Sequence, residues 1–113
     1  MTEDELLIGV TDLLTARNWR WVHYRRSDQA KMMGHAGLPD IIAVSASRRR
    51  LLFIELKTVR GRIDDEQYEW LGAFQAVAGV VVDEGSLTGH RMPEVYVWRP
   101  IDWLDDTIDR LLR

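Results

Sequence analysis

The first 17 residues carry apolar side chains at the spacing of one helical face, namely Leu6, Leu7, Val10, Leu13 and Leu14. Thr2 stands in the N-cap position, and Glu5, three residues later, completes the pattern of a capping box. The pattern predicts a helix from Thr2 to Arg17 that ends at Asn18. Residues 19–24 are rich in aromatic side chains and alternate loosely, which predicts a strand.

Two short apolar runs, residues 40–44 and 51–57, are separated by a polar turn at residues 45–49. Their length favours two β-strands that pair as an antiparallel hairpin. Pro39 fits the start of the first of these strands, and the unbroken apolar run after it predicts burial on both faces. Residues 25–37 carry two glycines and no clean period, which predicts a long loop.

The second half of the chain begins with another helix signal, because Asp64 can act as N-cap with Gln67 as its capping-box partner. This predicts a helix that stops at Gly79. We then expect a short strand at residues 80–82, an exposed loop at 83–93, a strand at 95–98 and a terminal helix at 101–113. The predicted order is therefore α-β-β-β-α-β-β-α.

Length and composition limit the class of protein. A chain of 113 residues, 46% hydrophobic and 29% charged, fits one compact domain spanning residues 1–113. The absence of cysteine excludes disulfides and thiolate metal sites. No apolar run is long enough to cross a bilayer, and the acidic start lacks the basic region of a secretion signal. We expect a cytoplasmic protein, or one acting in the host cytoplasm if a bacteriophage encodes it.

The net charge of -3 hides an asymmetry between the two halves of the chain. Residues 1–62 hold 11 Lys and Arg against 7 Asp and Glu, whereas residues 63–113 hold 4 against 11. A basic half can meet phosphate while the acidic half faces solvent. A solvated surface with uneven charge explains the same counts. The candidate phosphate contacts are Arg25, Arg26, Lys31, Arg48, Arg49 and Arg50.

The hairpin register decides which charged side chains meet. If the turn is centred between Ser47 and Arg48, Asp40 lies opposite Glu55, with Cβ atoms about 4.5 to 5.5 Å apart. The two-residue period then places Lys57 on the face of Glu55. Two carboxylates beside one ammonium suit Mg²⁺ and metal-assisted phosphodiester hydrolysis. The alternative to a metal site is that Asp40 is a turn residue at the entry of its strand, and that Glu55 and Lys57 form an exposed ion pair on an edge strand.

Several segments, in this order along the chain, resemble the stand-alone VRR-NUC domain, a branch of the PD-(D/E)xK nuclease superfamily. They are Gly37-Leu38-Pro39-Asp40, Phe53-Ile54-Glu55-Leu56-Lys57-Thr58, Gly61-Arg62, Gln67 followed by Trp70-Leu71, and Val95-Tyr96-Val97-Trp98-Arg99-Pro100. The resemblance implies a restriction-endonuclease-like α/β core, in which helices flank a central mixed β-sheet. It also implies DNA cleavage that depends on Mg²⁺ or Mn²⁺.

The resemblance carries roles onto individual residues. It implies that Asp40 and Glu55 bind metal together with the Leu56 carbonyl, that Lys57 is the catalytic lysine and that Gln67 lies beside the site. His23 matches a histidine at the end of the family's first strand, which implies contact with the metal, a water molecule or phosphate, and a purely structural histidine is the alternative. The family often has an acidic residue in the first helix. Of Glu3, Asp4 and Glu5, we favour Glu3, because it shares a face with Leu7, Val10 and Leu14.

The resemblance further implies a likeness to Holliday-junction resolvases, which act as homodimers. With the residues above, it predicts a divalent-metal-dependent, structure-specific DNA endonuclease that acts as a homodimer on branched DNA such as four-way junctions. The alternatives are a catalytically silent DNA-binding module of the same fold and a nicking or exonuclease-type enzyme. Trp19 and Trp21 are two residues apart, and we expect them at a dimer interface rather than stacked on bases. Residues 80–94 form a longer link than is usual in the family. This link is interpreted either as an element that contacts the substrate or the dimer partner, or as surface without a specific role.

Overall fold

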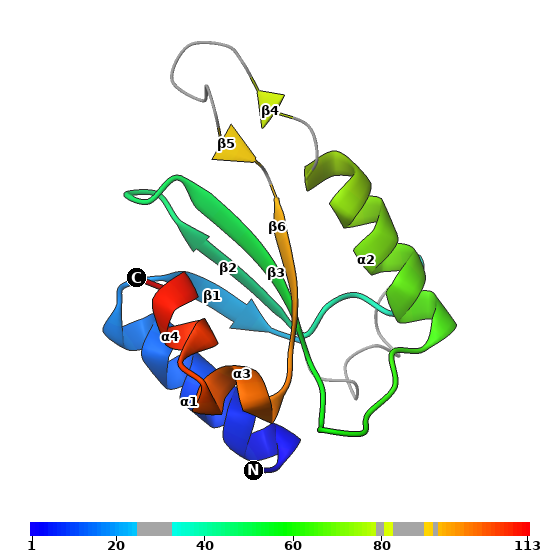
Figure 1. Ribbon diagram of the computed structural model, residues 1–113. Coiled ribbons are helices and arrows are strands. Elements are labelled where there is room, and N and C mark those ends of the chain that lie inside the picture. The colour runs from blue at the N-terminus through cyan, green and yellow to red at the C-terminus, as the bar shows by residue number, and fades with distance from the viewer. Residues whose placement is uncertain (25–32, 79–80, 83–89, 92) are drawn as a thin grey trace.

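A computed structural model describes residues 1–24, 33–78, 81–82, 90–91 and 93–113. Its centre is a mixed four-stranded β-sheet (Figure 1). The first three strands are antiparallel neighbours, and the fourth runs parallel to the third. In spatial order the strands are β1 (Arg20–His23), β2 (Ile41–Ser45), β3 (Arg50–Leu56) and β6 (Glu94–Trp98).

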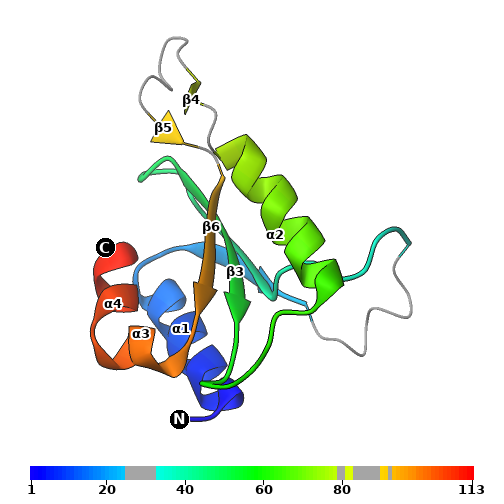
Figure 2. The same ribbon diagram turned by 45° about the vertical axis from the view of Figure 1, so that its right-hand side comes forward.

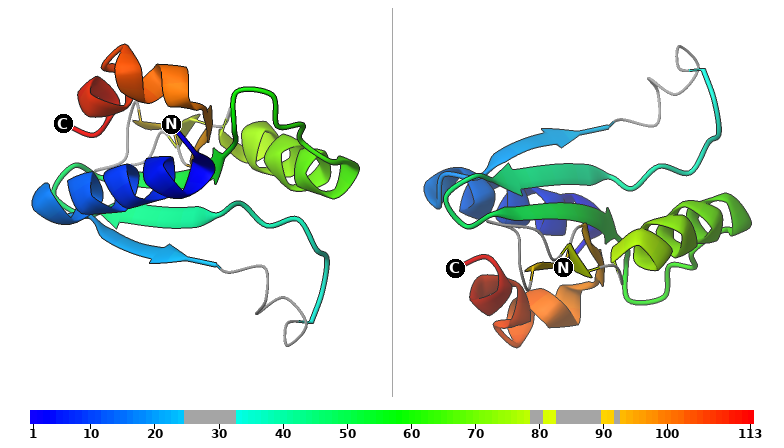
Figure 3. Two further views of the ribbon diagram at one scale, coloured as in Figure 1. Left: turned by 90° about the horizontal axis from the view of Figure 1, so that it is seen from below. Right: turned by 90° about the horizontal axis from the view of Figure 1, so that it is seen from above.

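Helices flank this sheet on both sides, as predicted (Figures 2 and 3). One layer contains α1 (Glu3–Ala16), α3 (Pro100–Leu104) and α4 (Thr107–Leu111), and the other contains α2 (Asp65–Ala78). None of the helices in the described part of the chain has the length and apolar character needed to span a membrane. Between α2 and β6 lies a small antiparallel pair, β4 (Val81–Val82) and β5 (His90–Arg91). The sequence predicted β4, but β5 falls in a stretch predicted to be a loop.

The main core forms where α1 packs on the sheet. The N-terminus of α1 has the predicted capping box, in which the Glu5 main-chain N–H donates to Thr2 Oγ1 at 3.0 Å and the Thr2 N–H donates to Glu5 Oε1 at 3.2 Å. One face of this helix is fully buried against alternate residues of β2 and β3. The core residues from these elements are Leu6, Val10, Leu14, Ile41, Ala43, Leu52, Ile54 and Leu56.

The opposite face of the sheet is only partly covered. The Phe53 ring of β3 stacks on Phe74 of α2 with ring centroids 3.9 Å apart, so α2 covers the β3 side of the sheet. Val44 of β2, on the same face as Phe53, remains 39% exposed. The prediction that the β2 run is buried on both faces is therefore wrong at Val44. The apolar run did not reveal that the single helix on this side lies over β3 and β6.

The terminal helix predicted at residues 101–113 is wrong in one respect, because the structure contains two short helices, α3 and α4. Asp106 separates them with a φ of 66°, in the left-handed region, which breaks the helical path. Asp105 Oδ1 accepts the Thr107 N–H at 3.0 Å and so supports the start of α4. Apolar spacing continues across this break, so periodicity alone could not locate it.

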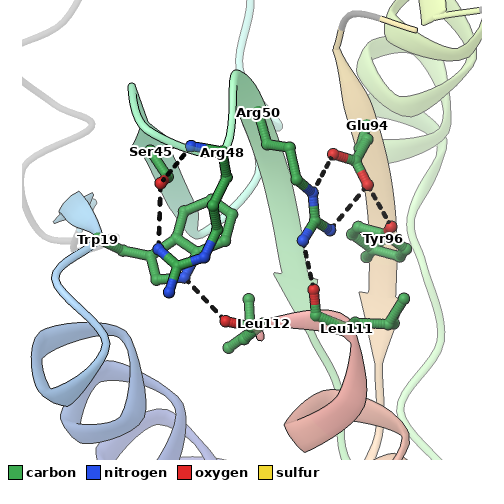
Figure 4. A network of polar contacts seen from close by, with 8 residues as sticks. All are labelled: Trp19, Ser45, Arg48, Arg50, Glu94, Tyr96, Leu111 and Leu112. Carbon is green, nitrogen blue, oxygen red and sulfur yellow. Dashed lines mark hydrogen bonds and ion pairs between the residues drawn. The ribbon is translucent and has the colours of Figure 1, made fainter. Parts of the chain in front are cut away.

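The turn of the β2–β3 hairpin is tied to the C-terminal end of the chain (Figure 4). The Arg48 and Arg50 guanidinium carbons lie 5.0 and 5.3 Å from the centroid of the Trp19 ring. The Trp19 indole N–H donates to the Leu112 carbonyl at 3.1 Å, and the residue is only 4% exposed. Trp19 is therefore a core residue, and its predicted place at a dimer interface is wrong. Trp21 remains partly exposed.

Candidate active site

The predicted hairpin register is present in the structure. Ile41 pairs with Ile54 and Ser45 with Arg50, which sets Asp40, one residue before β2, in line with Glu55. Asp40 extends the pairing, because its Oδ2 accepts the Leu56 main-chain N–H at 2.8 Å. Both carboxylates therefore lie at the same end of the central strands.

The Glu55 carboxylate is buried and only partly satisfied. Its residue is 1% exposed. Its Oε1 accepts a hydrogen bond from Gln67 Nε2 at 2.7 Å and lies 3.6 Å from the Lys57 ammonium. Its Oε2 is buried without a hydrogen-bond partner among the described residues. A buried, unpartnered carboxylate oxygen next to a second carboxylate is the donor set that a hard divalent cation requires.

The pKa of Glu55 also favours a cation at this site. Burial, and next the charge of Asp40, raise the pKa of Glu55 to about 8, and the nearby Lys57 ammonium offsets this only in part. The single positive charge of Lys57 therefore does not compensate the negative charges of Asp40 and Glu55 at a position this deeply buried. A second positive charge at this spot would stabilise both ionised groups.

Gln67 links the site to the start of α2. Its Oε1 accepts the Asp64 main-chain N–H at 3.1 Å, while Asp64 Oδ1 accepts the Gln67 N–H at 2.8 Å. This is the predicted capping box. Because the amide oxygen is used by the cap, the NH₂ group faces Glu55. Helix capping and carboxylate orientation thus depend on one side chain.

Two surface hollows meet at Asp40. One is lined by Glu3, Asp4, Leu7, His23, Tyr24, Asp40 and Leu56. Glu3 and His23 thus border the same space as Asp40 and Leu56, and so does Asp4. The other hollow lies between residues 33–38 and the start of α2, and Asp40 and Gln67 border it. Over the described ranges, no three Asp, Glu or His side chains cluster tightly enough to hold a metal ion by themselves.

Of the predicted phosphate contacts, the structure places only the three arginines at residues 48–50, and these do not lie at this site. Arg25, Arg26 and Lys31 lie outside the described residues. Arg48, Arg49 and Arg50 lie at the hairpin turn, at the opposite end of β2 and β3 from Asp40 and Glu55. Figure 4 shows Arg48 and Arg50 at this turn. Arg48 donates to Ser45 Oγ at 3.1 Å, and Arg50 pairs with Glu94 at 2.7 Å.

Two residues that contribute to the surroundings of the site were missed. Tyr24 lines both hollows, and its N–H donates to the Asp40 carbonyl at 2.9 Å. Arg99 follows β6 and donates to the carbonyls of Thr58 and Gly61, just beyond Lys57. A usable signal existed for Arg99, because the ends of neighbouring parallel strands lie side by side and β6 is parallel to β3.

The mixed four-stranded sheet flanked by helices is compatible with a restriction-endonuclease-like α/β fold, the fold of PD-(D/E)xK nucleases. The family model of the VRR-NUC domain matches residues 21–85, more than half of the chain, and the chain belongs to this family. Neither a curated protein nor a solved structure matches the chain.

Proposed function

We propose that this protein is a divalent-metal-dependent, structure-specific DNA endonuclease that hydrolyses phosphodiester bonds in branched DNA. The observation that carries the proposal is the convergence of Asp40 and Glu55, with a buried unpartnered oxygen on Glu55 and the Lys57 ammonium beside it. Membership of a nuclease family supports the reaction class. A cytoplasmic location fits a DNA substrate.

Asp40, Glu55 and the Leu56 carbonyl are the groups that would hold the ion, and Glu3 and His23 border the same space. A bound Mg²⁺ or Mn²⁺ supplies Lewis-acid stabilisation of the charge that develops on the phosphodiester. The hydrogen bond from Gln67 fixes Oε1 of Glu55, which leaves Oε2 for the ion.

Lys57 is the residue placed to act on the nucleophile. Its ammonium lies 3.6 Å from Glu55 Oε1 and can orient a water molecule toward phosphorus. The water oxygen forms a bond to phosphorus, the bond from phosphorus to the sugar oxygen breaks, and the leaving oxygen takes a proton. The products are one phosphate end and one hydroxyl end.

The test is cleavage of four-way junction, flap and linear duplex DNA with Mg²⁺ or Mn²⁺, with the product ends mapped. We expect internal cuts on the branched substrates. Asp40→Ala and Glu55→Ala should abolish cleavage while DNA affinity stays similar or rises, because a negative charge beside phosphate is removed. Binding without turnover by the parent protein would favour the silent DNA-binding module, and cuts only at strand ends would favour an exonuclease.

We further propose that the active species is a homodimer. Two-fold symmetry suits a four-way junction, because two active sites then address two opposed strands. Support comes from β1, at the edge of the described sheet, where Val22 and the neighbouring Val44 lie on one face and leave apolar area exposed. Sedimentation velocity should give a dimer, and Val22→Asp should give a monomer. A parent that sediments as a monomer at micromolar concentration contradicts this proposal.

A further inference from the structure

The connection between β3 and α2 lies directly beside the candidate active site (Figure 1). It begins after Leu56 with Lys57 and ends at Asp64, the cap of the helix that carries Gln67. Any strand of DNA whose phosphodiester reaches Lys57 therefore passes close to this segment. Residues 58–62 are defined here as the post-lysine loop.

The post-lysine loop is held in one conformation. Arg99 Nη1 donates to the Thr58 carbonyl at 2.6 Å and to the Gly61 carbonyl at 2.8 Å. The Gly61 N–H donates to the same Thr58 carbonyl at 3.3 Å, which closes a turn. A Cβ on Gly61 would lie 2.8 Å from Thr58 Oγ1 and 3.2 Å from the Thr58 main-chain nitrogen, so a larger residue would require Thr58 to shift.

Arg99 is itself held in place. It follows β6, and its main-chain N–H donates to Asp102 Oδ2 at 2.8 Å in the first turn of α3. The main-chain N–H of Lys57 donates to the Trp98 carbonyl at 3.0 Å, which extends the parallel pairing of β3 and β6 to the start of the loop. The loop is therefore held from the side of β6 and α3.

The outer side of this loop presents two free cations. Arg60 and Arg62 are exposed, and neither has an ion pair or hydrogen bond with any residue in the described ranges. Arg50, by contrast, is committed to Glu94. The acidic residues Asp64, Asp65 and Glu66 follow directly in the sequence, so the basic stretch ends at Arg62. Guanidinium groups on a rigid scaffold are effective ligands for phosphate oxygens.

We propose that the post-lysine loop is a preorganised phosphate-binding element that holds the backbone of the cleaved DNA strand beside Lys57. Arg60 and Arg62 contact phosphate oxygens, and Arg99 is a positioning residue that keeps the loop in shape. The choice of DNA as the polyanion rests on the proposed function.

The test measures binding of a fluorescent four-way junction to a Glu55→Gln protein, which binds without cutting, between 50 and 200 mM NaCl. Each phosphate contact contributes about 0.9 to the slope of log K against log salt concentration. Arg60→Gln and Arg62→Gln should each weaken binding several fold and lower this slope by about 0.9, and the double variant by about twice that. Arg110→Gln is the matched control, because Arg110 is an exposed arginine on α4.

Arg99→Gln should weaken binding and lower the salt slope although Arg60 and Arg62 remain, and Arg99→Lys should restore part of the loss. A purely structural role would change the melting temperature without changing the slope. Unchanged slopes in folded Arg60 and Arg62 variants, an equal loss in Arg110→Gln, or no binding of junction DNA by Glu55→Gln each overturns the proposal. A parent that cleaves no DNA while the slopes fall as expected overturns the nuclease function and leaves the loop assignment standing.

Discussion

At the scale of single residues, Gln67 combines two tasks in one amide group. The oxygen completes the helix cap with Asp64, and the nitrogen donates to Glu55. The two ends of the amide are not interchangeable, because Glu55 needs a donor and the Asp64 N–H needs an acceptor. This explains why a glutamine, and not a glutamate, suits the third position of a helix next to a carboxylate site.

Gln67→Glu tests this requirement. The new carboxylate still accepts the cap hydrogen bond, but it faces Glu55 with a like charge instead of a donor. We expect retained helix content and a loss of kcat on the order of 10²-fold, a loss typical of a displaced catalytic group. Gln75→Glu, the same change at an exposed position of α2, should cleave as fast as the parent. Equal rates for both variants would contradict the role assigned to Gln67.

Substitutions of Lys57 and of Asp40 should have different effects on turnover and on metal binding. Lys57→Ala removes the ammonium that orients water but leaves both carboxylates, so turnover should fall about 10²- to 10⁴-fold, the usual contribution of a proton-transfer group. Calorimetric titration with Mn²⁺ should still show binding. Asp40→Ala should lose both turnover and Mn²⁺ binding. Undiminished Mn²⁺ affinity in Asp40→Ala would place the ion elsewhere.

At the scale of elements, the segment that leads into β2 sets the position of Asp40. Gly37 has a φ of 93°, and a Cβ there would lie 2.5 Å from the main-chain carbon of Glu66 at the start of α2. The Trp70 indole N–H donates to the His35 carbonyl at 3.2 Å and holds the same segment from the helix side. The approach to Asp40 is thus packed directly on the helix that carries Gln67.

Gly37→Ala should therefore lower the free energy of unfolding by more than the backbone strain of a positive φ alone. Gly34→Ala is the matched control, since Gly34 also has a positive φ, 107°, but its Cβ would meet no atom within 4 Å. We expect Gly34→Ala to lose about 1–2 kcal/mol of stability, the ordinary cost of that conformation, and to cleave normally. Gly37→Ala should lose more stability and most of its activity. Urea unfolding and junction cleavage measure both, and identical behaviour of the two variants would contradict this packing argument.

The elements also show how far sequence alone could reach. The hairpin register followed from one turn, because two-residue periodicity propagates from the turn to Asp40 and Glu55. The capping boxes at Thr2 and Asp64 were visible as short patterns. The break at Asp106 and the exposure of Val44 were not visible, since the first depends on a single left-handed residue and the second on where α2 lies over the sheet. Arg99 was missed because its partners are main-chain carbonyls distant in sequence.

At the scale of the whole molecule, Arg50 connects three elements. It forms two hydrogen bonds to the Glu94 carboxylate, at 2.7 and 2.9 Å, and donates to the Leu111 carbonyl at the end of α4 (Figure 4). Tyr96 also donates to Glu94, at 2.7 Å. Burial raises the pKa of Glu94, but the hydrogen bonds from Arg50 and Tyr96 outweigh it, so this pKa is lowered overall. Arg50 of the basic run at the hairpin turn thus stabilises the packing of β3, β6 and α4.

Glu94→Gln should destabilise the protein by about 1.5–3 kcal/mol at pH 7, the usual range for hydrogen bonds to a charged group. Because the pKa of Glu94 is lower in the folded state, its contribution is present above about pH 4.5 and is lost as the pH falls through the folded-state pKa. Urea unfolding should show the difference between parent and variant shrinking at acidic pH. A difference that stays constant from pH 7 to pH 3 would contradict this assignment.

The four residues between Ser45 and Arg50 lie far from the chemistry, yet their number fixes which residue faces Glu55. One inserted residue that shifted the register would set Asp40 against a neighbour of Glu55 and turn the two acids to opposite faces of the sheet. The length of the turn therefore determines whether the two carboxylates lie opposite each other. Relatives that cleave DNA should accept almost any composition there but should share its length.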